Sequence, residues 1–519
     1  MNPIELKLFS SRVSAICDEM GTVLRRTAFS PNIKDRLDFS CALFSRSGKL
    51  FAQAAHIPVH LGSMAFAMQS IVENRQWSNG DMLVLNDPYL GGTHLPDVTL
   101  IAPVFVEQGR GLLGFVANRA HHANIGCDTP GSMPISSSLE EEGLIIPPTL
   151  LFKSGQLQPE ALSLLEIRGD SLSGDFAAQA GANKLGVQRL QELLTTMSIE
   201  GYEQGMDELN DYADRITANT IAGLQVGEYS FTDYLDDDGC GQSNIQLALT
   251  LRIRPDHLEM DFRDSSEQVA GNLNCPESVV AAAAFYCVRC LLPEDPPACE
   301  GLFRRIHLQT RAGSIVNANR PAAVAAGNVE TSSRLVDLVF GALAKALPDR
   351  IPAASQGTMN NVAMGYIDDE KGARWDYYET LAGGIGGGPN TAGRDAVHSH
   401  MTNTLNTPVE SLEMHYPLRV HRYAVRHGSG GKGKHGGGAG IVREYEFLDQ
   451  AQLTLLSERR LISPWGLNGG GEGMKGRNSL NGETLPGKCS IAVKKGDRLL
   501  IETPGGGSWG EPTLLKFPS

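Results

Sequence analysis

The segment 82–122 constrains this chain more than any other, because it combines two strand-like runs with histidines and aspartates near their ends. The first run leads into a turn rich in Asp, Pro and Gly that contains His94 and Asp97. The second run ends at the pair His121 and His122. Imidazole and carboxylate groups held at the ends of buried strands are typical ligands of first-row metal ions. The segment therefore predicts a metal site built on a sheet.

A plainer interpretation of the same residues stays open. Asp87 and Asp97 could cap turns, and the histidines could be ordinary core or surface residues. We favour the metal because four such side chains fall within one strand–turn–strand unit. Together with Asp38, at the mouth of an earlier strand, they give nitrogen and oxygen ligands without sulfur. Such a set suits zinc, manganese, iron or nickel, and His122 would be an alternative ligand or the partner of a ligand.

A site of two histidines and carboxylates can leave a coordination position open, which is typical of catalytic rather than structural metal sites. An ion in such a site polarises a carbonyl or lowers the pKa of a bound water towards about 7. Asp38, Asp87 and Glu142 are the candidate catalytic acids, as base or orienting group, although each could equally be a turn or surface acid. A second polar cluster, His398 and His400, could line a substrate pocket or bond loop backbone.

Length and charge limit the class of protein. A chain of 519 residues exceeds one ordinary domain. We expect an N-terminal metal-site region over 1–225 and a C-terminal α/β region with glycine-rich loops over 226–519. The net charge of -14 argues against nucleic acid or an anionic membrane surface as partner. The start of the sequence has no continuous apolar run like that of a signal peptide, so the cytoplasm is the expected compartment.

The hydrophobic pattern predicts an α+β fold, a mixed α/β body with antiparallel and mixed sheets flanked by helices. Strands and helices do not alternate regularly enough for a doubly wound sheet or a TIM barrel. Asn328 is the expected N-cap of a late helix, and His56 and His60 precede an early one. The expected helices cover 4–27, 62–74, 159–224, 278–292 and 328–347, and the expected strands include 39–44, 50–53, 82–86 and a meander that begins near 228.

Several common catalytic motifs are absent. No G-x-x-x-x-G-K-[ST] occurs, and no G-x-G-x-x-G follows a strand, so we place no ATP on this chain. The glycine-rich segments are expected to serve tight turns and close backbone packing. No G-x-S-x-G elbow is present. Cys127 follows the histidine pair, but a packed, inert thiol is favoured over a nucleophile there.

The motifs NDPYLGGTHLPDVTLIAPVF and ANRAHHANIG resemble the hydantoinase B family, the B subunits of ATP-dependent hydantoinases, oxoprolinases and lactamases. Related subunits occur in acetone and acetophenone carboxylases. The resemblance continues through RLDFSCALF, NLNCPESV, AAGNVETSSRLVD, HMTNTLNTPVE and TPGGGSWG, and it covers essentially the whole chain in order. Family members usually have Asp and Gly where this chain has Asn124 and Cys127. That departure could change the surroundings of the metal or the substrate class.

The resemblance implies a metal-bearing subunit that works with a separate ATP-binding A subunit, in a hetero-oligomer of (AB)2 or larger. By motif match the metal ligands are His94, Asp97 and His121, with Asp38 as a fourth. Zinc or manganese is expected first and iron next. The implied reaction is hydrolysis of a lactam or cyclic imide that the A subunit activates with ATP. Three alternatives stay open: carboxylation of a ketone, a non-catalytic scaffold for the ATPase partner, and a metallohydrolase that needs neither ATP nor partner.

Overall fold

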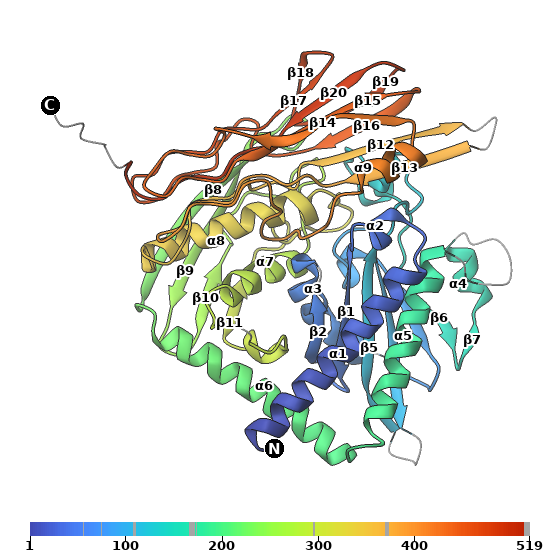
Figure 1. Cartoon of the computed structure of the whole chain (residues 1–519). Helices are drawn as coiled ribbons and strands as arrows, with labels where there is room; N and C mark the ends of the chain where they lie inside the picture. Colours follow the sequence, from blue (N-terminus) through green and yellow to red (C-terminus); the bar gives the residue numbers. More distant parts are fainter. Residues whose placement is uncertain are drawn as a thin grey trace.

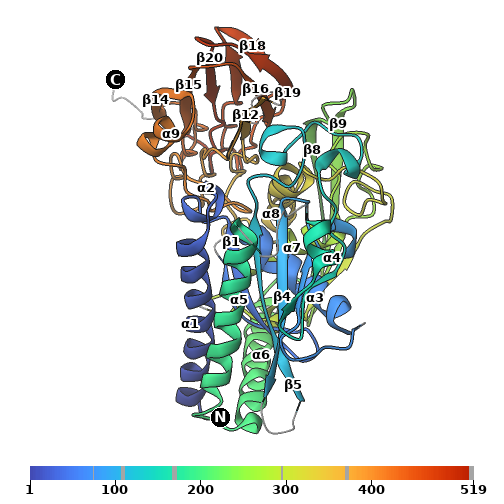
Figure 2. The ribbon, with the colours of Figure 1, turned by 90° about the vertical axis from the view of Figure 1, so that its right-hand side faces the viewer.

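The computed structural model describes residues 1–55, 57–73, 75–106, 111–165, 172, 174–293, 296–368 and 373–512. The described part forms four sheets with helices packed on them, which confirms the expected α+β fold (Figure 1). The two C-terminal sheets lie together at one end of the molecule, above the helices and the two other sheets (Figures 1 and 2). Within the described residues, no helix is both long and apolar enough to cross a membrane.

The N-terminal sheet has seven antiparallel strands in the order β2-β1-β5-β4-β3-β6-β7. Alternate residues of its central strands enter two different cores: Val98 and Leu100 join the largest hydrophobic cluster, whereas Ile101 joins another. Both faces are therefore buried, as the continuous apolar runs require. The strands are β1 (Phe39–Ser45), β2 (Leu50–Ala55), β3 (Met82–Leu85), β4 (Asp97–Val106), β5 (Gly111–His121), β6 (Thr149–Lys153) and β7 (Gln156–Leu157).

Two long helices, α1 (Pro3–Thr27) and α5 (Gly174–Leu193), lie side by side on one flank of this sheet (Figures 1 and 2). A third long helix, α6 (Ile199–Ala222), runs at an angle to them (Figure 1). Asn2 and Glu5 form a capping box that begins α1. The expected helix 159–224 is instead α4 (Pro159–Leu164), α5 and α6, and Ser198 caps the start of α6.

The helix α3 (Pro58–Glu73) lies on the other flank and packs closely on α7 (Glu277–Arg289). It begins four residues earlier than the expected 62, because proline is well suited to the first turn of a helix. This places His60 inside the first turn of α3.

The middle sheet has the order β11-β10-β9-β8, in which β10 and β11 pair in parallel and the other pairs are antiparallel. Its strands are β8 (Gly227–Asp237), β9 (Ser243–Ile253), β10 (Leu258–Asp261) and β11 (Ile306–Gln309). α8 (Ser332–Ala346) packs on β8 and β9. The expected helix 328–347 starts with a π-helical turn, η5 (Gly327–Thr331), so Asn328 lies inside that turn and is not an N-cap.

The C-terminal end contains two antiparallel sheets, ordered β13-β12-β16-β19 and β14-β15-β20-β17-β18, around a hydrophobic cluster of their own. The largest cluster contains residues from both sides of 225, and the domain boundary there stays a prediction. The strands are β12 (Asn361–Asp368), β13 (Ala373–Glu379), β14 (Leu418–Arg426), β15 (Gly440–Phe447), β16 (Ala451–Leu456), β17 (Arg477–Leu480), β18 (Glu483–Leu485), β19 (Lys488–Val493) and β20 (Arg498–Glu502). The shorter helices are α2 (Pro31–Lys34), α9 (Val409–His415) and the 3-10 turns η1 (Pro88–Leu90), η2 (Pro130–Ser132), η3 (Leu139–Glu142) and η4 (Glu300–Leu302).

The glycine-rich segments pack backbone against backbone. Gly438 N donates to Ile385 O at 2.8 Å, and Gly506 N donates to Gly438 O at 2.9 Å. A Cβ at Gly384 would lie 1.9 Å from Gly438 O, so only glycine fits there. Close packing therefore accounts for glycine at these positions without a phosphate ligand.

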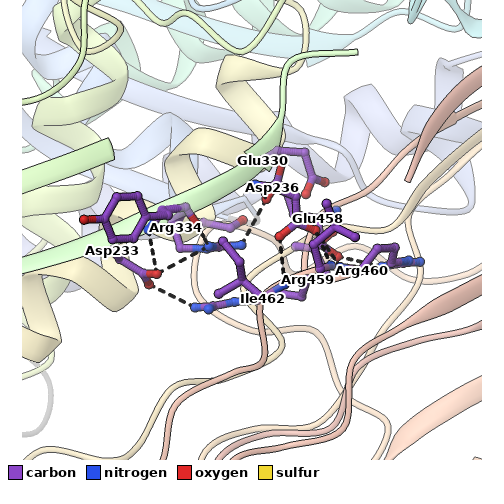
Figure 3. A network of polar contacts seen from close by, with 12 residues as sticks. Asp233, Asp236, Glu330, Arg334, Glu458, Arg459, Arg460 and Ile462 are labelled. Carbon is purple, nitrogen blue, oxygen red and sulfur yellow. Dashed lines mark hydrogen bonds and ion pairs between the residues drawn. The ribbon is translucent and has the colours of Figure 1, made fainter. Parts of the chain in front are cut away.

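A buried ionic network joins the middle sheet and α8 to the C-terminal end (Figure 3). Arg459 donates to Asp337 at 2.7 Å and to Asp233 at 3.1 Å. Arg334 and Lys488 both donate to Glu458, at 3.1 and 2.6 Å. Charges desolvated in this way are tolerated only when paired, so the network fixes how the two parts of the chain meet.

Candidate metal centre

Three of the expected ligands meet at one end of the N-terminal sheet. Asp97 is the first residue of β4, and the ladder pairs it with His121, the last residue of β5. Asp97 Oδ1 lies 3.1 Å from His94 Nε2 and 3.4 Å from His121 Nδ1. One ligand atom from each residue falls within 4.8 Å of the others, and all three residues are buried. We call His94, Asp97 and His121 the His–Asp–His cluster.

Hydrogen bonding around His94 decides which of its ring nitrogens faces Asp97. His94 Nδ1 lies 3.2 Å from Ala325 O, and since a carbonyl only accepts, Nδ1 carries the proton. Neither His94 Nε2 nor His121 Nε2 has a hydrogen-bond partner among the described residues. In neutral His94 the Nε2 lone pair would face a carboxylate oxygen at 3.1 Å, which is repulsive unless a cation lies between them. The residues present therefore fit a divalent metal ion.

Burial and the close packing of these groups shift their pKa values in different directions. Burial opposes charge on Asp97, but the neighbouring His94 and His60 outweigh it and hold the pKa of Asp97 well below its usual value. Burial also opposes charge on His94, yet Asp97 raises the pKa of that imidazole overall. The pKa of His121 is lowered, mainly by burial. Metal binding requires an anionic carboxylate and two neutral imidazoles, so an ion would compete with a proton for His94 Nε2.

Three side chains hold the second oxygen of Asp97. Thr93 Oγ1 donates to Asp97 Oδ2 at 2.7 Å, Asn328 Nδ2 donates to it at 3.3 Å, and His60 Nε2 lies 3.3 Å away. His60 Nδ1 in turn lies 3.1 Å from Ser40 Oγ. Partners of this kind orient metal ligands and tune their basicity. Sequence reasoning noticed His60 without assigning it a role, and His56 lies outside the described residues.

His122 lies on the opposite face of the sheet from His121, because successive strand residues point to opposite faces. Its Nε2 is 2.9 Å from Gln179 Oε1, and its ring packs against Phe176 on α5 at 4.5 Å between centroids. The side chain of His122 is therefore bonded to α5 and is not among the three that meet at Asp97, and its role as an alternative ligand stays a prediction.

Asp38 lies beside the cluster without joining it. Its backbone oxygen accepts from His121 N at 3.0 Å, while its carboxylate faces Arg36 at 3.7 Å. Asp38 is not among the three residues whose ligand atoms converge. Its role as a fourth ligand stays a prediction.

The other candidate acids have different surroundings. Glu142 is buried, and its Oε1 accepts from Ser136 Oγ at 2.8 Å and from Val324 N and Ala325 N at 2.9 Å each. Burial raises its pKa to about 7. Asp87 caps the turn η1 and pairs with Arg320, so the turn interpretation accounts for it.

Two further candidates lie elsewhere. Burial raises the pKa of the Cys127 thiol, and its Sγ donates to Glu141 O, which fits the inert, packed thiol. His400 Nε2 lies 3.4 Å from Asp337 Oδ1, at the edge of the buried ionic network. Burial, and to a smaller extent the charge of nearby Arg36, lowers the pKa of the His398 imidazole to about 3.

Proteins of known family resemble this chain in sequence and in fold. The chain belongs to the hydantoinase B/oxoprolinase family, whose model matches residues 2–512. It is 40% identical over 547 residues to 5-oxoprolinase 1 of Arabidopsis thaliana, covering 98% of this chain and 42% of that protein. The chain thus spans about two fifths of the length of that relative.

Two solved structures share the fold. The ATP-dependent caprolactamase of Pseudomonas jessenii superposes with a TM-score of 0.90 at 27% identity, covering 98% of this chain and 91% of the other. A nucleotide-free acetone carboxylase superposes with a TM-score of 0.86 at 17% identity, covering 99% and 76%. The second likeness shows the fold alone.

Proposed function

We propose that this chain is the metal-dependent B subunit of an ATP-dependent cyclic amidase. A separate A subunit would activate a lactam or cyclic imide with ATP, and this chain would hydrolyse the ring. The observation that carries the proposal is the buried His–Asp–His cluster, in which His94 Nε2 and His121 Nδ1 both face Asp97 Oδ1. Family membership and the likeness to caprolactamase support the reaction class.

The residues of the chain would act mainly by positioning. A bound zinc or manganese ion, or iron, would polarise a carbonyl or activate water. Thr93, Asn328 and His60 hold one oxygen of Asp97, which leaves the other for the ion. Glu142 accepts from Ala325 N, and Ala325 O fixes the tautomer of His94, so Glu142 is a positioning residue. With its pKa raised to about 7, Glu142 can also hold or release a proton near neutral pH.

ATP is assigned to the partner. The sequence lacks a Walker motif. The chain covers only 42% of 5-oxoprolinase 1, so the rest of that longer protein could correspond to a separate A subunit here. We expect an (AB)2 or larger assembly. Purified alone, the chain should hydrolyse no ATP, and robust single-chain ATPase activity would contradict the two-subunit proposal.

The competing function is carboxylation of a ketone, which the resemblance to carboxylase subunits left open; acetone carboxylase shares the fold. Such a site would stabilise an enolate instead of a hydrolytic intermediate. The two functions differ in their co-substrate, because carboxylation incorporates labelled bicarbonate into product and ring hydrolysis incorporates labelled water.

The test is reconstitution with an A-type subunit and a panel of lactams, hydantoins and 5-oxoproline, with ATP. Ring opening coupled to ADP release, and lost in Asp97→Ala, is the expected result. Equal turnover by wild type and Asp97→Ala would reject the site. Ring opening by the isolated chain without ATP would instead identify a self-sufficient hydrolase.

A further inference from the structure

Arg36 is a fully buried cation between the N-terminal and C-terminal parts of the molecule. It follows α2 and reaches β13. Nη1 donates to Tyr378 O at 3.1 Å and, more weakly, to Asn32 Oδ1 at 3.4 Å. Nη2 donates to Thr380 Oγ1 at 3.1 Å. Neutral oxygens therefore accept all three of these hydrogen bonds.

The charge of Arg36 is incompletely neutralised. Asp38 is the one carboxylate within 4.0 Å of it in the described part of the chain, and its 3.7 Å separation exceeds hydrogen-bonding distance. Arg36 Nε is buried and has no hydrogen-bond partner in that part either. A buried cation normally finds a close anion. The guanidinium thus keeps both charge and an N–H group available for a further anion.

His398 provides a second unmatched group nearby. Both of its ring nitrogens are buried and lack partners among the residues described, although the residue as a whole is partly exposed. Burial and the neighbouring Arg36 lower its pKa to about 3, so the imidazole is neutral and one nitrogen carries a hydrogen to donate. Unmatched buried donors are costly, and two of them together indicate a missing acceptor.

Arg36 lies next to the His–Asp–His cluster, with the ring of Tyr378 between them. Arg36 Cζ is 4.9 Å from the centroid of the Tyr378 ring. The same ring stacks on His121, with centroids 5.0 Å apart and planes 9° from parallel. Tyr378 is held in place because its hydroxyl donates to Asn361 Oδ1 at 2.7 Å. One fixed aromatic ring therefore connects the cation to a proposed metal ligand.

We propose that Arg36 and His398 form an oxyanion-binding subsite, which holds the phosphoryl or carboxylate group of the substrate beside the metal centre. The proposal rests on the proposed function, since an ATP-activated ring carries a phosphoryl group and a 5-oxoproline-like ring carries a carboxylate. Guanidinium groups bind both kinds of oxyanion.

A purely structural role explains less of the geometry. As a latch, Arg36 would join α2 to β13 through the contacts of Nη1 and Nη2. That role does not explain why Arg36 Nε has no hydrogen-bond partner among the described residues, or why the buried ring nitrogens of His398 have none there. It also predicts that replacing His398 with an apolar ring leaves anion binding unchanged.

The test is calorimetric titration of the purified chain, with and without metal, with inorganic phosphate and separately with acetate. His398→Phe is the main variant because it breaks no described hydrogen bond, and Arg36→Lys is the second. His307→Phe, an exposed histidine on the edge strand β11, is the matched control. We expect His398→Phe to weaken oxyanion binding about tenfold, with the control unchanged. Tighter phosphate binding would assign the phosphoryl source, and tighter acetate binding the carboxylate source.

Two results would overturn the subsite: no oxyanion binding by wild type, or equal affinity in wild type and His398→Phe. Binding that disappears when the metal is removed would also overturn it, because the ion itself would then be the site. Metal content of the same samples tests the proposed function separately. Normal metal without oxyanion binding rejects the subsite alone, whereas variant-sensitive binding in a chain that takes up no metal rejects the proposed function alone.

Discussion

At the scale of single residues, the tautomer of His94 links the fold to the chemistry. Ala325 O fixes the proton on Nδ1, and Nε2 is left facing Asp97 in a buried site. Glu142 helps to hold Ala325 in place, because its Oε1 accepts a hydrogen bond from Ala325 N. Glu142 also has a titration range of its own, which gives a prediction about stability.

Glu142→Gln should flatten part of the pH dependence of unfolding. Burial raises the pKa of Glu142 from 4.5 to about 7, so the folded state binds more protons than the unfolded state between these values. The stability that Glu142 gives the folded state is therefore fully present below pH 4.5 and is lost as pH rises through about 7. Between pH 4.5 and 8 the free energy of unfolding should fall by up to about 3 kcal/mol more in the wild type than in the variant. Urea unfolding across this range measures the difference, and parallel curves would contradict it.

At the scale of elements, strand register and one π-helical turn build the cluster. The pairing of Asp97 with His121 brings two ligands together from the ends of β4 and β5. The turn η5 brings Asn328 to Asp97 from 231 residues away in the sequence. π-Helical turns occur often at functional sites, where they re-aim a side chain within a helix.

Asn328→Ala should lower metal affinity by about tenfold to a hundredfold while leaving the ligands in place. Removal of this amide frees Asp97 Oδ2 from one of its three partners. Asn118→Ala is the control. Asn118 is also a buried amide, but it lies on the face of β5 opposite to His121 and is bonded to Gln179 and Asn183. Competition titrations against a chelator compare the two variants. Equal affinities would show that Asn328 does not position the site.

The sequence predicted the cluster because local motifs place His94, Asp97 and His121 at strand ends. It could not decide between His121 and His122, since both are histidines and only the register with β4 shows which one shares a face with Asp97. The roles of His60 and Asn328 depend on helix α3 and turn η5, which approach the sheet through tertiary packing. The early start of α3 and the π-helical turn were also missed, because helical periodicity fixes element boundaries poorly.

At the scale of the whole molecule, a buried ionic network fixes the C-terminal end against α8 and β8 (Figure 3). The same end contributes Tyr378, whose ring stacks on His121. Correct seating of the C-terminal sheets is therefore a condition for a complete site.

Arg459→Met should destabilise the chain by about 3–5 kcal/mol, because it leaves Asp233 and Asp337 buried without this partner. Arg311→Met is the control: Arg311 pairs with Glu267 at an exposed position, where an ion pair contributes less than about 1 kcal/mol. Urea unfolding of both variants gives the comparison. A loss for Arg459→Met no larger than for the control would mean that the network does not hold the two parts together.

Elemental analysis of the purified chain shows whether the His–Asp–His cluster binds a metal ion. Wild type should contain about one transition metal ion per chain, and His94→Ala and Asp97→Ala should lose it. His122→Ala, which changes the neighbouring residue on the opposite face of the sheet, should keep it. Full metal content in His94→Ala and Asp97→Ala, or loss of metal in His122→Ala alone, would contradict the account.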